Sequence, residues 1–241
     1  MAKTDVATAP QVKSVAGFMA GDQLPDHLRN GTGAGNENVS SNDMTVPRLD
    51  VLQQLSPQLD PTNPKYIEGA KLGQLFDSLS GDLYDHVWVV NLQYEVRYQI
   101  FKKRDFGGGF EGSFDSEADA LAHLDSNNLT RAQYDVVETA IHKCLMLDEN
   151  GLPKQPVLIY MSGSKAKVSK EWNSSILLKD PRADRFASVW TLTAKAEKNK
   201  KGQSYFNFGV DFAGWAGAEL YEEAKKAYLG LVGTPAGETV H

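Results

Sequence analysis

The sequence lacks most of the features that would assign a chemistry directly. Its 241 residues contain a single cysteine, Cys144, which excludes an internal disulfide and a multi-cysteine zinc site. The five histidines are isolated and show no His-x-x-x-His spacing typical of a metal site. No apolar run approaches the roughly 20 residues of a membrane span, and the amino terminus has no secretory signal. We therefore expect a cytoplasmic chain without cofactor, metal or membrane contact.

Catalytic signatures are missing as well. The glycines at 107–109 are not followed by the Gly-Lys-Ser or Gly-Lys-Thr of a phosphate-binding loop, and no serine lies in a glycine elbow. Asp82, Asp85 and His86 form one small group that a metal ion could draw together. The sequence therefore predicts a binding protein and no enzyme. The enzymatic alternative is a metal-dependent nuclease built from dispersed carboxylates.

Positive charge is present, and it is concentrated in one stretch of an otherwise acidic chain. The formal net charge is -6, yet residues 165–201 hold ten Lys or Arg against four Asp or Glu, a local balance of +6. The other 204 residues then carry -12. Aromatic residues, among them Trp190 and Tyr205, are interleaved with these cations, as a surface for a polyanion with stackable bases requires. The alternative is a solvated hairpin whose lysines protect an edge strand.

Hydrophobic periodicity predicts a chain that is mainly β. Even-numbered residues from Trp88 to Ile100 are almost all apolar and the odd-numbered ones mostly polar, which indicates a long strand with one buried face. The later elements are predicted as a short helix over 117–124, a strand ending at Leu147, a strand over 157–161, a helix after Ser164, a hairpin over 189–212 and a closing helix over 216–231. Five strands with a helix between the third and fourth is the order of the oligonucleotide/oligosaccharide-binding (OB) fold. We therefore expect an α+β chain built on a five-stranded OB-fold-like barrel.

Composition also predicts the domain boundaries. Residues 1–42 are rich in glycine and polar residues, so they are expected to form a flexible arm. Residues 43–232 are expected to form a single nucleic-acid-binding domain with an N-terminal extension and a C-terminal helix. Residues 233–241 are expected to form a flexible tail.

The predicted binding surface lies on the two loops that form the ligand groove of an OB fold. These are the loop after the first long strand and the turn of the hairpin, where cations and aromatic residues collect. Alternation along the strands adds outward-facing positions, with Tyr205 and Asn207 expected to face outward on the last strand. The candidate nucleic-acid-binding residues are Arg97, Phe101, Lys102, Lys103, Arg104, Phe106, Phe110, Thr193, Lys195, Lys198, Lys200, Lys201 and Tyr205.

Several short motifs resemble a known family. They are Asp43-Met-Thr-Val-Pro-Arg-Leu49, Tyr66-Ile-Glu-Gly-Ala70, Gly107-Gly108-Gly109 and Lys170-Glu-Trp-Asn173. Together with the aromatic hairpin they make the chain similar to single-stranded-DNA-binding proteins of tailed phages. The resemblance implies a protein that coats single strands during DNA replication or recombination, in the cytoplasm of an infected host cell. Residues 233–241 contain one acidic residue, so recruitment of partners through an acidic tail is not expected.

These patterns predict single-stranded DNA as the partner, with replication or recombination proteins as further candidates. Homo-oligomerisation is left open. The alternative function is a protein-interaction or virion-assembly module in which the hairpin meets an acidic protein surface.

Overall fold

The computed structural model describes residues 26–28, 30–32, 34–39 and 45–232. The chain divides into two units, residues 1–43 and 44–241. The first unit contains a short 3-10 helix, η1 (Asp26–Leu28). The arm expected over residues 1–42 lies mostly outside the described residues, and the tail expected over residues 233–241 lies wholly outside them. All elements discussed below belong to the second unit.

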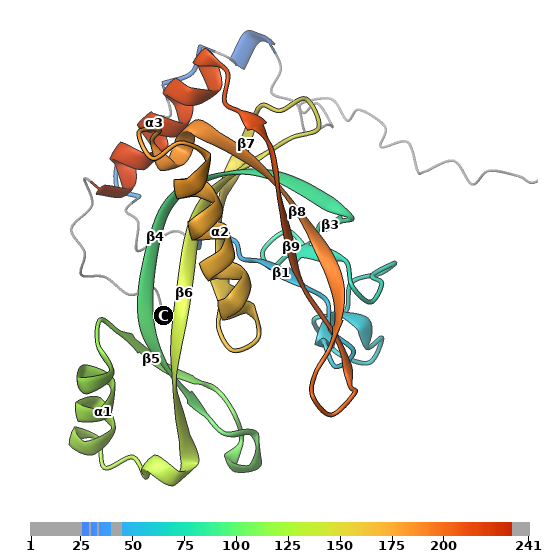
Figure 1. Cartoon of the computed structure of the whole chain (residues 1–241). Helices are drawn as coiled ribbons and strands as arrows, with labels where there is room; N and C mark the ends of the chain where they lie inside the picture. Colours follow the sequence, from blue (N-terminus) through green and yellow to red (C-terminus); the bar gives the residue numbers. More distant parts are fainter. Residues whose placement is uncertain (1–25, 29, 33, 40–44, 233–241) are drawn as a thin grey trace, which may run out of the picture. The chain divides into compact units, whose positions relative to one another are not determined.

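A six-stranded antiparallel sheet dominates the second unit (Figure 1). Its strands are β4 (His86–Lys102), β5 (Phe110–Phe114), β6 (Tyr134–Leu147), β7 (Pro153–Met161), β8 (Ser188–Lys198) and β9 (Ser204–Trp215). Strand β4 pairs with β6 along nearly its whole length. The opposite edge of β4 pairs first with β8 and, further along, with β5. The resulting order is β7-β6-β4-β8-β9, with β5 beside β4.

The remaining elements flank this sheet. A smaller sheet contains β1 (Leu49–Val51), β2 (Leu75–Asp77) and β3 (Leu83–Tyr84). The α-helices are α1 (Glu117–Ser126), α2 (Lys165–Lys179) and α3 (Ala218–Val232). Short 3-10 helices are η3 (Pro57–Leu59), η4 (Arg104–Phe106), η5 (Arg131–Gln133) and η6 (Arg185–Ala187). None of the helices in the described ranges is both long and apolar enough to cross a lipid bilayer.

The chain order of long strands and helices agrees with the sequence prediction. The fold is mainly β, and α2 stands between the third and fourth long strands, β7 and β8. Ser116 caps α1 as expected, because its side chain accepts a hydrogen bond from the Asp119 amide. The small sheet β1-β2-β3 and strand β5 were not predicted, since strands of two to five residues carry too little periodicity to be recognised.

A closed barrel, which the sequence led us to expect, does not form in the described part of the chain. The two edge strands, β7 and β9, do not pair with each other there. Residues 47–53 contact both edges instead. The carbonyl of Pro47 accepts a hydrogen bond from the Leu158 amide of β7 at 2.9 Å. At the other edge, the Gln53 side chain donates to the Phe206 carbonyl at 2.7 Å and accepts from the Phe206 amide at 3.0 Å. A side-chain amide thus takes the place of a strand partner.

Gln53→Ala is therefore expected to destabilise the domain. Two hydrogen bonds to the backbone of β9 would be lost, and we expect a decrease of about 1–2 kcal/mol in the free energy of unfolding. Urea denaturation followed by tryptophan fluorescence measures it. The neighbouring Gln54 is exposed, so Gln54→Ala is the matched control. Equal stability of the two variants would show that the Gln53 contacts do not hold this edge.

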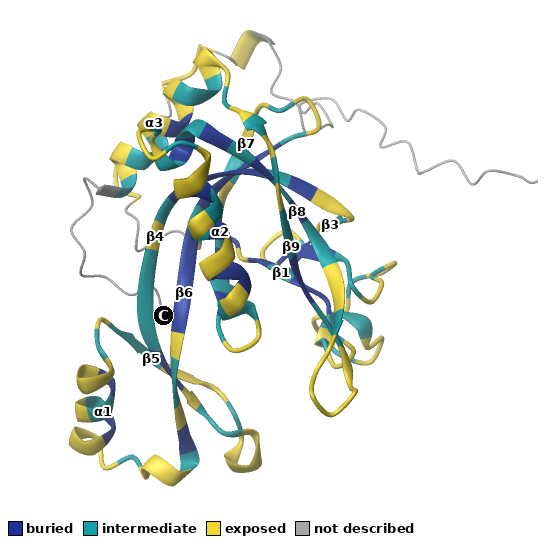
Figure 2. Cartoon of the chain, viewed as in Figure 1, coloured by how far each residue is buried: buried dark blue, intermediate teal, exposed yellow. Residues whose placement is uncertain are grey.

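Strand β4 also differs from the prediction of one buried face. Val89 and Val90 point to opposite faces and both have an exposed fraction of 0 %. Val89 belongs to the core cluster that contains Trp172 of α2, whereas Val90 packs in a second cluster with Ala224 of α3. The strand is therefore covered by helices on both sides in its first half. Figure 2 shows that its second half is less buried.

Candidate functional site

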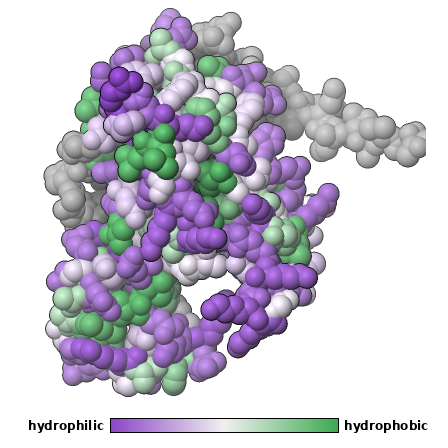
Figure 3. Space-filling view, in the orientation of Figure 1, coloured by the Kyte–Doolittle hydropathy of each residue, from purple (hydrophilic) through white to green (hydrophobic). Residues whose placement is uncertain are grey.

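Two projections of the domain, together with the ends of the strands that lead into them, carry most of the predicted binding residues. The first is the lobe of residues 103–133, which contains η4, β5 and α1 and packs on Ile100 and Tyr134 at the ends of β4 and β6. The second is the hairpin turn, residues 199–203, between β8 and β9. Figure 3 shows an open indentation between the lobe and the hairpin, and the surface of the hairpin side is hydrophilic. The two predicted loops thus face a common open space.

The lobe and the adjoining end of β4 offer four predicted cations of two kinds. Lys102 and Arg104 form no ion pair or side-chain hydrogen bond with any described residue. Lys103 donates to the Ala132 carbonyl at 2.8 Å and lies 3.6 Å from Asp135, and Arg97 is ion-paired with Asp115. Of these four cations, Lys102 and Arg104 are therefore free for an anionic ligand, while Arg97 and Lys103 are already engaged.

The predicted aromatic residues of the lobe and of the adjoining end of β4 are exposed. The exposed fractions are 36 % for Phe101, 46 % for Phe106 and 48 % for Phe110. The rings of Phe101 and Phe110 lie 5.6 Å apart at an angle of 59°, so they pack against each other on the surface. Large apolar rings beside free cations are suited to stacking with nucleobases.

The hairpin presents four lysines without an ion pair or side-chain hydrogen bond among the described residues, namely Lys195, Lys198, Lys200 and Lys201. Figure 2 shows that the turn is exposed. Asn199 holds its shape, because its Oδ1 atom accepts from the amides of Lys201 at 2.9 Å and Gln203 at 3.0 Å. Gly202 adopts φ 78°, a conformation that favours glycine. The lysines therefore project from a fixed backbone.

Tyr205 and Thr193 are less open than expected. The Tyr205 hydroxyl donates to Glu197 at 2.6 Å, and this bond lowers the pKa of the Glu197 carboxyl. The expectation that Asn207 faces solvent is wrong: its exposed fraction is 1 %, and its side chain donates to the Ser164 carbonyl at 3.2 Å. The start of α2 covers this face of β9. Thr193 lies against Gly209 of β9 and is half-buried.

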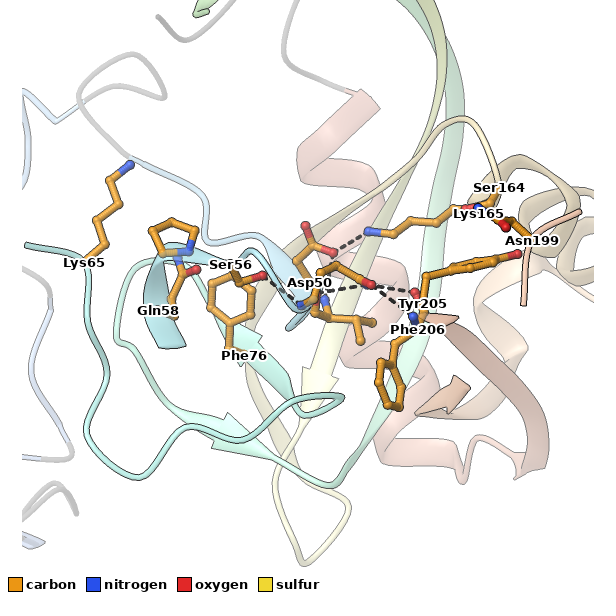
Figure 4. A pocket seen from close by; sticks show the side chains of 13 residues that line it. Asp50, Ser56, Gln58, Lys65, Phe76, Ser164, Lys165, Asn199, Tyr205 and Phe206 are labelled. Carbon is orange, nitrogen blue, oxygen red and sulfur yellow. Dashed lines mark hydrogen bonds and ion pairs between the residues drawn. The ribbon is translucent and has the colours of Figure 1, made fainter. Parts of the chain in front are cut away.

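Tyr205 instead lines a cavity of about 670 Å³ between the hairpin and the segment before β2. Figure 4 shows Lys165 extending from the start of α2 to its ion-pair partner Asp50. The rings of Phe76, Tyr205 and Phe206 and the polar side chains of Gln58, Lys65 and Asn199 also line it. Sequence reasoning missed this cavity because Asp50, Gln58, Lys65 and Phe76 lie more than 100 residues from the hairpin. Aromatic walls with a few polar groups suit a planar ligand.

A network of hydrogen-bonded polar side chains lies between β4, β6 and α2. The Arg185 Nε–H donates to Asn91 Oδ1 at 2.8 Å, and the Asn91 amide group contacts His142 Nδ1 at 2.9 Å. His142 Nε2 lies 2.8 Å from Ser169 Oγ. Because Arg185 can only donate, Asn91 must donate to His142 Nδ1, which leaves the proton on Nε2. Burial, with Arg185 as the lesser cause, lowers the pKa of His142 to about 3, so this histidine is neutral.

Two of the three residues considered for a metal, Asp82 and Asp85, accept hydrogen bonds from neighbouring side chains. The described residues contain no group of three or more His, Cys, Asp or Glu side chains placed to hold an ion. Asp82 accepts from the Tyr84 hydroxyl at 3.1 Å and lies 3.5 Å from Lys154. Cys144 is buried, and burial raises the pKa of its thiol.

Comparison with known proteins finds one family. A phage protein family, described as Pam3 phage gp34-like protein, matches residues 17–236. No curated protein and no solved structure gives a significant match. The phage source implied by the sequence motifs agrees with this family, whereas DNA binding stays a prediction. With nearly the whole sequence matched, the chain belongs to the Pam3 phage gp34-like protein family.

Proposed function

We propose that this phage protein binds and protects single-stranded DNA without sequence preference during phage DNA replication or recombination, in the cytoplasm of the infected cell. The observation that carries the proposal is the set of cations that no described residue pairs with, namely Lys102 and Arg104 where β4 enters the lobe and the lysines of the hairpin. Exposed rings of Phe101, Phe106 and Phe110 lie on the lobe with the first group. Cations neutralise phosphates, and rings stack with bases that only a single strand leaves accessible.

The strand order supports the proposal. In an OB fold, a partly open five-stranded barrel, the ligand groove is formed with the loops between strands 1 and 2 and between strands 4 and 5. Taking β4, β6, β7, β8 and β9 as these five strands places the 103–133 lobe and the hairpin turn at those two loops.

Titration with fluorescent oligo-dT tests the proposal. Binding should weaken steeply between about 50 and 200 mM salt, because phosphate contacts release counterions. A single strand should bind more tightly than a duplex of equal length, because the rings have no bases to stack with in a duplex. Equal affinity for both forms, or no binding at low salt, would contradict the proposal.

Reversing two charges on the hairpin tests its role. Lys200→Glu/Lys201→Glu should leave the fold unchanged and lower the salt slope of oligo-dT binding by about 1.4 log units, about 0.7 for each lost phosphate contact. Lys225→Glu/Lys226→Glu is the matched control, because these adjacent lysines are equally exposed but lie on α3. If both double variants lose the same affinity, only net charge matters and the hairpin is not a contact site.

A protein interface is the second candidate. Leu177, Leu178 and Trp215 have exposed fractions of 63, 83 and 52 %. Trp215 packs on Phe212 at 5.5 Å, and Lys179 lies 4.1 Å above the same ring. A contiguous patch of exposed apolar side chains is typical of contact surfaces. Self-association that Leu178→Glu abolishes, in a protein that does not bind oligo-dT, would favour this function over DNA binding.

A further inference from the structure

Arg185 is a half-buried cation without a counter-ion. Its guanidinium donates to the side-chain oxygens of Asn91 and Asn173, which are both neutral. It also lies 5.5 Å from the ring centre of Tyr94. No carboxylate of the described residues forms an ion pair with it. Removing a charge from water is costly unless an opposite charge compensates, so this position is electrostatically suited to an anion.

Hydrogen bonds hold the guanidinium in place, but one of its nitrogens has no partner among the described residues. The chain of hydrogen bonds from Ser169 through His142 and Asn91 fixes Nε, and Asn173 fixes Nη2. Nη1 forms no hydrogen bond with the described residues, and it is not among their buried unpaired atoms, which are Gln93 Oε1, His123 Nε2 and Trp172 Nε1. Nη1 is therefore accessible to solvent with two N–H groups available.

The edge of β4 near Arg185 has no strand partner in the described part of the chain. Strand β4 pairs with β8 over residues 86–90 and with β5 over residues 98–101. Between these ranges, on the same edge, it has no strand partner among the described residues. Tyr94 lies in this interval with an exposed fraction of 37 %. A partly exposed ring therefore lies beside the guanidinium, 5.5 Å from its ring centre to the guanidinium carbon.

We propose that Arg185, with Asn173 and Tyr94 beside it, binds a phosphate group of the bound single strand. The source of the phosphate rests on the proposed function, whereas the anion site itself can be tested with inorganic phosphate. Arginine suits this role, because its planar fork donates paired hydrogen bonds to phosphate oxygens. The adjacent base would stack on Tyr94.

Asn173→Asp is the decisive variant. It keeps the side-chain shape but places a carboxylate against Arg185, which neutralises the guanidinium without removing it. We expect a higher melting temperature, about tenfold weaker oligo-dT binding and a salt slope reduced by about 0.7. Asn150→Asp adds the same charge in an exposed turn and should bind as the parent does. Unchanged affinity and slope in Asn173→Asp would overturn the site while leaving the proposed function intact.

Arg185→Lys and a phosphate titration complete the test. Lysine keeps the positive charge but cannot donate the paired hydrogen bonds of a guanidinium. We therefore expect several-fold weaker oligo-dT binding in a folded variant. If the parent protein does not bind oligo-dT, the proposed function fails and inorganic phosphate decides the site. The anion site is supported if millimolar phosphate shifts the Arg185 Nε–Hε NMR resonance in the parent but not in Asn173→Asp. No shift with either oligo-dT or phosphate would overturn it.

Discussion

Phe208→Ala is expected to lower the free energy of unfolding by about 3–5 kcal/mol, the usual cost of removing a buried phenylalanine ring. Phe208 lies in β9 with an exposed fraction of 2 % and belongs to the central core with Trp172 and Trp190. Truncation would leave a cavity between the hairpin and α2 that neither element can close. Chemical denaturation at neutral pH measures the loss.

Phe106→Ala is the matched control for this prediction. The same atoms are removed from an exposed ring on η4, and stability should change by no more than about 0.5 kcal/mol. Under the proposed function, Phe106→Ala should instead weaken oligo-dT binding by about 1–3 kcal/mol. The reverse result, a stable Phe208→Ala and an unstable Phe106→Ala, would show that core and surface aromatics are assigned to the wrong groups.

The free energy of unfolding is expected to decrease as the pH falls below about 6.5, which is well above the pH at which carboxylates titrate. His142 has a pKa of about 3 in the folded chain against 6.5 as its ordinary value. Between these values the unfolded chain binds one more proton, so stability is fully present above pH 6.5 and falls as the pH decreases toward 3. We expect a loss of about 2–3 kcal/mol between pH 7 and pH 4.5.

His142→Gln provides the comparison. Glutamine is neutral at every pH and can both donate and accept, so this variant should lose less stability over the same pH range, whatever its stability at pH 7. The measured quantity is the change in unfolding free energy from pH 7 to pH 4.5 by urea denaturation. Parallel pH profiles for parent and variant would exclude His142 as the cause.

The long elements could be predicted from the sequence because their signals are local. Strand β4, the β8–β9 hairpin and helices α1, α2 and α3 each repeat a period over ten or more residues. The free cations of the hairpin were found the same way, since lysines in a polar turn are exposed whatever the rest of the chain does. Lys102, Arg104 and Phe106 were found from the charge and the aromatic residues that follow the long strand.

Tertiary structure alone decided how these elements meet. Gln53 replaces a strand partner at β9, and Asp50 and Phe76 form a cavity with Tyr205 across more than 100 residues of sequence. Arg97 and Lys103 read as free cations in the sequence, but Asp115 and the Ala132 carbonyl engage them. Arg185 reads as one more surface arginine, yet the packing of η6 against β4 and α2 half-buries it among neutral amides. Charge and period are properties of single segments, whereas pairing and desolvation depend on which segments lie side by side.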